Sequence, residues 1–116
     1  MAETILVVDD DEGVRAVAQQ ALLAQGYTVL ETGDPQQAIH IAKHQRIDLL
    51  LTDVIMPITK GTELADRVQA VTPSTKVLLM SGYQTSDIAS SGRPFMAKPF
   101  SIDGLVRRVR ETLDRP

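Results

Sequence analysis

Three short aliphatic runs most constrain the fold of this chain. They are residues 4–8, 49–52 and 77–80, and polar residues do not alternate with apolar ones within them. Such runs are typical of strands that are buried on both faces, as in parallel sheets covered by helices on each side. The chain is therefore expected to place helices between its strands rather than to fold as an antiparallel sandwich.

Amphipathic segments separate these runs. Apolar residues recur at helical spacing around residues 14–22, 35–42, 61–71 and 102–113. Three of these segments are preceded by N-cap residues, Asp11, Asp34 and Ser101. Two weaker strands are expected at residues 28–30 and 94–97. Strict alternation of strand and helix indicates an α/β fold, with a parallel sheet covered on both faces, in a single domain of residues 1–116.

The helix faces expected to pack inward include Val17 in the first helix and Ile102 in the last. Residues 81–92 differ from the rest, because they are rich in Ser and Gly and offer at most one helical turn near residues 87–90. The fourth helix is therefore expected to be shortened or irregular.

Composition argues against several classes of function. The chain has no Cys, which excludes disulfides, thiolate metal sites and Cys nucleophiles. It has no Trp, only two Phe and two Tyr, and a net charge of −3, so no direct contact with nucleic acid is expected. No apolar stretch approaches the ~20 residues of a membrane span, and no signal peptide is visible, so no membrane association and a cytoplasmic location are expected.

Polar residues follow the strands at the edge where a ligand is expected. Residues 9–11 follow the first strand, Asp53 the third, Ser81 the fourth and Lys98 the fifth. The carboxyl ends of parallel strands share one edge of the sheet, so these side chains should converge. Crowded carboxylates repel unless a cation lies between them, and oxygen ligands of this kind suit Mg²⁺. A lysine at the same place would neutralise the remaining charge or hold an anion.

Four motifs occur in order along the chain. They are Val-Val-Asp-Asp-Asp at residues 7–11, Leu-Thr-Asp-Val-Ile-Met-Pro-Ile-Thr-Lys-Gly at 51–61, Met-Ser-Gly at 80–82 and Lys-Pro-Phe at 98–100. This ordered set resembles the receiver domain of two-component response regulators, and the resemblance covers the whole chain. It implies a flavodoxin-like, doubly wound sheet of five parallel strands in the order 2-1-3-4-5. It also implies a phosphoacceptor function in a signalling pathway of the kind found chiefly in bacteria.

The resemblance assigns the acceptor and metal roles by position. Asp53 would be the phosphoacceptor, a carboxylate nucleophile that forms an acyl phosphate. Asp10 and Asp53 would bind Mg²⁺ directly together with the backbone carbonyl of Ile55, and Asp9 would act through a metal-bound water.

It also assigns the residues that would respond to the phosphoryl group. Lys98 would pair with that group, and Ser81 would donate its hydroxyl to it. Phe95 would be the switch aromatic, turning inward when Ser81 moves. The Lys98–Pro99 bond resembles the family's cis peptide. Ile55 and Tyr83 are bulky, and they are expected to hinder attack by water and to prolong the phosphoryl lifetime.

The partners implied by the resemblance are a histidine kinase or phosphotransfer protein as donor, and a downstream protein or a fused output domain as recipient. The segment before Lys98 is shorter than in most receivers. Dimerisation through the face next to it is therefore not expected, and the chain should be a monomer or weak dimer. A stand-alone receiver and a domain cut from a larger regulator or hybrid kinase both remain open, although the Met1 start favours an N-terminal or single-domain position.

Three other functions fit the sequence less well. A receiver that only binds partners is disfavoured by the intact set of acidic, Ser and Lys residues. A phosphatase of the aspartyl-phosphate class needs an acid two residues after its nucleophile, where this chain has Ile55. A nucleotide-binding protein needs a Gly-rich first loop, which here is acidic. The chain is thus expected to be a signalling domain with at most weak autophosphatase activity.

Two further clusters are better explained as solvated surface. His40 and His44 are four residues apart, a spacing that can bind a metal, but they lie away from the strand ends. The basic run of residues 107–110 is expected to be the exposed side of the last helix, since the domain is acidic overall.

Overall fold

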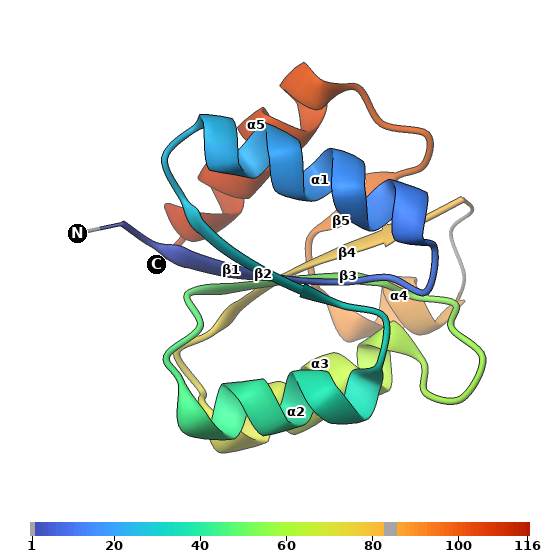
Figure 1. Ribbon diagram of the computed structural model, residues 1–116. Coiled ribbons are helices and arrows are strands. Elements are labelled where there is room, and N and C mark those ends of the chain that lie inside the picture. The colour runs from blue at the N-terminus through green and yellow to red at the C-terminus, as the bar shows by residue number, and fades with distance from the viewer. Residues whose placement is uncertain (1, 83–85) are drawn as a thin grey trace.

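A parallel sheet of five strands forms the centre of the molecule, as a computed structural model describes it over residues 2–82 and 86–116 (Figure 1). The strands are β1 (Thr4–Val8), β2 (Thr28–Thr32), β3 (Leu49–Asp53), β4 (Lys76–Ser81) and β5 (Phe95–Ala97). Their order across the sheet is β2-β1-β3-β4-β5, and every neighbouring pair is parallel. The predicted doubly wound order is confirmed.

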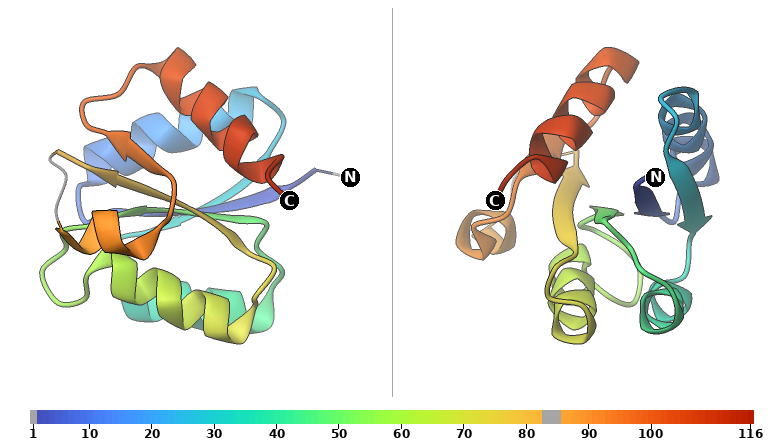
Figure 2. Two further views of the ribbon diagram at one scale, coloured as in Figure 1. Left: turned by 180° about the vertical axis from the view of Figure 1, so that it is seen from behind. Right: turned by 90° about the vertical axis from the view of Figure 1, so that its left-hand side faces the viewer.

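Five helices alternate with these strands. They are α1 (Glu12–Ala24), α2 (Pro35–His44), α3 (Gly61–Val71), α4 (Ser86–Ser91) and α5 (Ile102–Leu113). Helices α1 and α5 cover one face of the sheet, and α2 and α3 cover the other, with the short α4 beside them (Figures 1 and 2). Helix α4 has only six residues, which confirms the shortened fourth helix. None of the helices in the described ranges is long and apolar enough to cross a membrane.

Each central strand contributes to two separate cores. In β1, Leu6 and Val8 pack with α2 and α3, whereas Ile5 and Val7 pack with α1 and α5. All four side chains are completely buried. Strands β3 and β4 divide their residues between the two cores in the same way. This double burial explains why these segments contain almost no polar residues, and at about 25 cal/mol per Å² it is the main stabilising contribution to the fold.

The helix starts follow the capping chemistry expected from the sequence. The Asp11 carboxylate accepts hydrogen bonds from the N–H groups of Gly13 and Val14. Asp34 and Ser101 cap α2 and α5 in the same manner. These contacts satisfy backbone donors that would otherwise lack helical partners. Helix α3 is the exception among these, because its N-cap is Lys60 and makes no side-chain capping bond.

Two residues expected in the core are exposed instead. Ile102 is 56% exposed, because it begins α5, whose first turn stands farther from the sheet than its last turns (Figure 2). Val17 is 48% exposed and lines an open apolar groove between α1 and the segment that contains Pro99 and Phe100. Helical spacing alone identified the apolar stripe but not where the neighbouring elements end.

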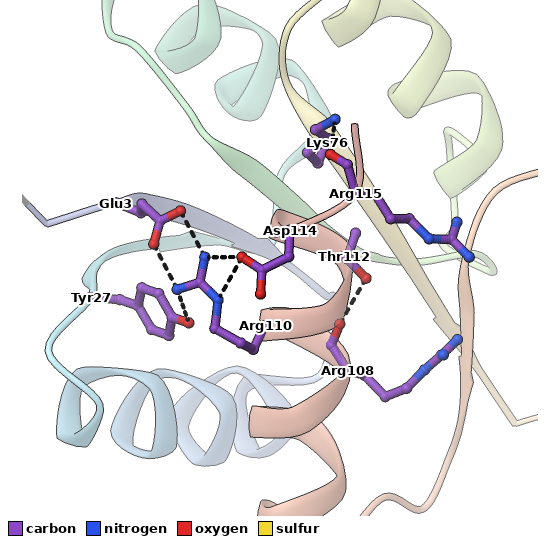
Figure 3. Close-up of polar contacts among 8 residues, drawn as sticks. All are labelled: Glu3, Tyr27, Lys76, Arg108, Arg110, Thr112, Asp114 and Arg115. Carbon is purple, nitrogen blue, oxygen red and sulfur yellow. Dashed lines mark hydrogen bonds and ion pairs between the residues drawn. The ribbon is translucent and has the colours of Figure 1, made fainter.

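The basic run at the end of α5 is more constrained than a solvated face (Figure 3). Arg110 bonds both carboxylate oxygens of Glu3, at 2.9 and 3.1 Å, and also reaches Asp114 at 2.8 Å. Arg108 is half-buried and donates to the carbonyl of Phe95 at 2.6 Å. The expected exposed side of the helix is therefore confirmed for Arg107 and Arg110 but not for Arg108. These contacts tie α5 to the residue before β1 and to the first residue of β5.

Gly61 is required by a close approach of two backbone segments. A Cβ atom at this position would lie 2.1 Å from the carbonyl oxygen of Asp53 and 2.9 Å from Cα of Val54. The approach is fixed by a hydrogen bond from the Gly61 N–H to the Val54 carbonyl, at 2.8 Å. Helix α3 can therefore start beside the end of β3 only with glycine at this position.

Gly61→Ala is expected to lower the free energy of unfolding by about 3 kcal/mol, the upper range for overpacking a rigid site. Urea unfolding followed by circular dichroism measures this change. Gly82→Ala is the matched control, because a Cβ there would meet nothing within 4 Å. Equal midpoints for the two variants would contradict the close-approach argument.

Candidate functional site

The predicted acidic residues converge at the carboxyl ends of the strands. Asp9 and Asp10 follow β1, and Asp53 is the last residue of β3. One carboxylate oxygen from each of the three lies within 4.8 Å of the others. Asp9 is completely buried, Asp53 is 7% exposed and Asp10 is exposed. The cluster therefore has a buried side against the sheet and an open side that a ligand can reach.

Lys98 joins this cluster from the other half of the sheet. Its ammonium lies 2.6 Å from Oδ2 of Asp9 and 3.3 Å from Oδ1 of Asp53. The Lys98–Pro99 peptide is cis, in agreement with the resemblance stated above. The N–H of Lys98 also donates to the carbonyl of Ser81 at 2.8 Å, which continues the β4–β5 ladder to the site. The lysine is thus held at both its backbone and its side chain.

Both carboxylate oxygens of Asp9 have partners within the protein. Oδ2 accepts from Lys98, and Oδ1 accepts from the N–H of Asp11 at 2.9 Å. Hydrogen bonds to a charged group are roughly twice as strong as neutral ones, so these contacts hold Asp9 firmly. An arrangement of this kind leaves Asp10 and Asp53 better placed than Asp9 to offer oxygens to a cation.

The charges in the cluster perturb one another. Burial raises the pKa of Asp53 above its ordinary value, the charges of Asp9 and Asp10 raise it further, and Lys98 opposes them. Burial alone would lower the pKa of Lys98, but its hydrogen bond to Asp9 and the charges of Asp9 and Asp53 outweigh burial and raise it. The lysine therefore stays protonated, and an added cation would favour the charged form of Asp53.

The other predicted site residues lie on the surrounding elements. Ser81 is buried at the end of β4 and pairs in register with Ala97. Phe95 is half-buried against the core on the α2–α3 side. Ile55 is 46% exposed in the loop after β3. Tyr83 falls outside the described residues.

The histidine pair is separate from this site. His40 and His44 are exposed on α2, with ring centroids 4.4 Å apart. Nδ1 of His44 lies 2.9 Å from the carbonyl oxygen of His40. The pair lies on a helix face, as expected, and not at the carboxyl ends of the strands.

Sequence reasoning missed one residue at the site, Arg15. This side chain of α1 turns back and donates to the backbone carbonyl of Asp9 at 2.7 Å. It is only 18% exposed and is also paired with Glu31. In the sequence, a single arginine on an amphipathic helix gives no signal that distinguishes it from a solvated residue.

Asp53→Asn is expected to stabilise the metal-free protein at pH 7. With a raised pKa, folded Asp53 binds a proton at higher pH than the unfolded chain does, so its contribution to stability falls as pH rises through this interval. The amide removes that penalty and should raise the melting temperature by about 4 °C, the shift that ~1 kcal/mol produces at this size.

Calorimetry in EDTA at pH 7 and pH 4 measures this difference, which should shrink at the lower pH. Asp103→Asn serves as control, because that carboxylate is exposed in the first turn of α5. If Asp53→Asn melts at or below the wild-type temperature at pH 7, the crowded carboxylates do not destabilise the metal-free protein.

Comparison with known proteins agrees with this geometry. Residues 5–110 match the family model described as the response regulator receiver domain. The chain is 31% identical to the probable transcriptional regulatory protein TcrX of Mycobacterium tuberculosis, over 97% of this chain and 50% of that protein. It is 30% identical to sporulation initiation phosphotransferase F of Bacillus subtilis, over 97% of this chain and 95% of that protein.

A solved structure, the receiver domain from the hybrid histidine kinase CckA, has a TM-score of 0.84 and 39% identity. It covers 96% of this chain and 99% of that one. The chain spans half or less of the length of the first two curated relatives, 50% and 24%.

Proposed function

The chain belongs to the response regulator receiver domain family, and we propose that Asp53 is the residue on which it accepts a phosphoryl group. Receiver domains are phosphoacceptor domains of two-component signalling, not enzymes with a small-molecule substrate. One observation carries the assignment to Asp53. This carboxylate lies within 4.8 Å of the other two carboxylates and 3.3 Å from the Lys98 ammonium, and it is 7% exposed, whereas Asp9 is completely buried.

The acceptor chemistry is a single displacement at phosphorus. An oxygen of the Asp53 carboxylate attacks the phosphorus of a phosphohistidine, the P–N bond breaks, and an acyl phosphate forms. The Lys98 ammonium, now held by Asp9 and Asp53, then has a phosphoryl oxygen as an additional anionic partner.

The acidic cluster fits Mg²⁺. Its donors are all oxygens, one carboxylate is exposed, and Asp53 has a raised pKa that a cation would relieve. Asp10, Asp53 and the backbone carbonyl of Ile55 would hold the ion, and Asp9 would contact it through water. Bound Mg²⁺ supplies the positive charge that screens the attacking carboxylate from the phosphoryl oxygens.

The response to phosphorylation is proposed to pass through Ser81 and Phe95. Ser81 would donate its hydroxyl to a phosphoryl oxygen. It is linked to the fifth strand by the Lys98 N–H bond and by the β4–β5 register, in which Leu79 pairs with Phe95. Phe95, half-buried, would then turn inward. Ser81 and Phe95 would thus have two arrangements, and the charge of the phosphoryl group would change the populations of the two.

The donor is proposed to be a histidine kinase or a phosphotransfer protein, and the recipient a downstream protein or an output domain. The names of the relatives support both, since they include a sporulation phosphotransferase, a hybrid kinase and transcriptional regulators. The six-residue α4 supports a monomer or weak dimer, because it offers little surface beside β5. A cytoplasmic location is proposed because the chain is similar to these receiver domain proteins.

Incubation with acetyl phosphate and Mg²⁺ tests the acceptor. Wild type is expected to gain about 80 Da, one phosphoryl group, in the intact mass. Asp53→Asn should gain nothing, and the Asp103→Asn control should behave as wild type. Addition of EDTA should abolish the gain. If neither acetyl phosphate nor a panel of phosphorylated kinases and phosphotransfer proteins modifies the wild type, Asp53 is not an acceptor.

The residue two positions after the acceptor is expected to set the phosphoryl lifetime. Ile55→Asn replaces an apolar side chain with one that can orient water, and loss of the phosphoryl group should accelerate by about tenfold, less than the ~100-fold of a positioned general base. Decay of the mass adduct after removal of the donor measures this rate. Ile58→Asn is the matched control, because Ile58 is in the same loop and 92% exposed. If wild type and Ile55→Asn lose the phosphoryl group at the same rate, Ile55 does not set the phosphoryl lifetime.

A further inference from the structure

The guanidinium of Arg15 connects the backbone of Asp9, beside the acidic cluster, to the side chain of Glu31. Its Nη1 donates to the carbonyl oxygen of Asp9 at 2.7 Å, and its Nε donates to the carboxylate of Glu31 on β2. The side chain is 18% exposed, although it begins on a surface helix. An arginine drawn inward to a backbone carbonyl and a carboxylate is a fixed part of the structure and not a solvated charge.

The carbonyl that Arg15 holds belongs to the peptide that leads into Asp10. A peptide unit is planar, so fixing the oxygen of Asp9 also fixes the N–H of Asp10 and the direction of its Cα. The rest of Asp9 is held by the hydrogen bonds of its carboxylate and by its own N–H, which donates to Thr32 at 3.3 Å. Arg15 is thus a side chain that contacts the carbonyl of this peptide directly.

We propose that Arg15 is a positioning residue for the metal site. By fixing the Asp9–Asp10 peptide, it keeps the exposed carboxylate of Asp10 aimed at the cation next to Asp53. The inference rests on the proposed function only in that a divalent cation binds the cluster. Outer-shell contacts that orient metal ligands commonly contribute ten- to a hundredfold, roughly, to metal affinity.

Gly33 leaves room for this position of the guanidinium. A Cβ atom at Gly33 would lie 2.6 Å from Nη1 of Arg15 and 3.4 Å from the carbonyl oxygen of Asp9. The two glycines with positive φ among the described residues are Gly26 and Gly92, so Gly33 has no conformational requirement of this kind. The absence of a side chain at Gly33 leaves the space that the guanidinium occupies.

Charge and geometry predict opposite effects of removing Arg15. The ion pair with Glu31 makes the pair neutral, so Arg15→Leu leaves an additional negative charge near the cluster. By Coulomb's law alone, that charge would strengthen cation binding. Loss of the bond to the Asp9 carbonyl would instead weaken it. The direction of the change therefore distinguishes positioning from electrostatics.

Binding of Mn²⁺, a probe for the magnesium site, is measured from the electron paramagnetic resonance signal of the free ion. Arg15→Leu is expected to raise the Kd for Mn²⁺ about tenfold. Gly33→Ala, which displaces the guanidinium, should raise it by a smaller factor. In the double variant, Gly33→Ala should add nothing to Arg15→Leu, because the group that it displaces is gone.

Arg93→Leu is the matched control for a purely structural effect. Arg93 is 17% exposed and pairs with Asp66 at 2.7 Å and with Gln69 at 2.9 Å, away from the cluster. It should lower the melting temperature about as much as Arg15→Leu does while leaving the Kd for Mn²⁺ unchanged. Melting of every variant in EDTA identifies any that does not fold.

The outcomes are distinct. If wild type binds no Mn²⁺, or if Asp53→Asn binds it as well as wild type does, the proposed metal site itself is wrong. If wild type binds Mn²⁺ and folded Arg15→Leu binds it equally or more tightly, the positioning role is wrong. The positioning role is also wrong if Arg93→Leu weakens Mn²⁺ binding as much as Arg15→Leu does. It is wrong, too, if Gly33→Ala weakens Mn²⁺ binding further in the double variant.

Discussion

The ion pair between the buried Asp9 and the partly buried Lys98 is the contact on which the organisation of the site depends. Asp9 has no exposure to water, and an unpaired charge in that position would be strongly destabilising. Its partner comes from the far end of the chain, after β5, so the pair links the first strand to the last element of the sheet. The same lysine faces Asp53, which places one cation between the most deeply buried carboxylate and the one that is proposed to react.

The sheet topology explains why these residues meet. Parallel strands all end at one edge, so residues that follow β1, β3, β4 and β5 are neighbours although the sequence separates them widely. Burial of both sheet faces makes the strands rigid, and this rigidity allows like charges to remain close together. The raised pKa of Asp53 is the electrostatic consequence, and it favours binding of a cation at this position.

Local signals in the sequence were sufficient for much of the structure. Doubly buried runs identified the strands, capping residues such as Asp34 marked helix starts within a residue, and the polar composition of residues 81–92 indicated the short α4. The failures concern tertiary contacts. Ile102 and Val17 have the spacing of core residues but lie where no element covers them, and Arg108 has the sequence of a surface residue but bonds to β5. The spacing of apolar residues predicts which face of a helix packs inward, but it does not show how far the neighbouring elements cover that face.

Residue patterns alone predicted the alternation of strand and helix and the parallel sheet. They also identified five candidate site residues, Asp9, Asp10, Asp53, Ser81 and Lys98. They did so because strand burial and strand ends leave local patterns of residue type. Other features became visible only in the folded chain: Asp9 binds Lys98 through one oxygen and the N–H of Asp11 through the other, Arg15 holds the Asp9 carbonyl, and Gly61 lies too close to the backbone of Asp53 for a side chain. These contacts join segments that are distant in sequence, and the physical reason is that packing, not local propensity, brings their atoms together.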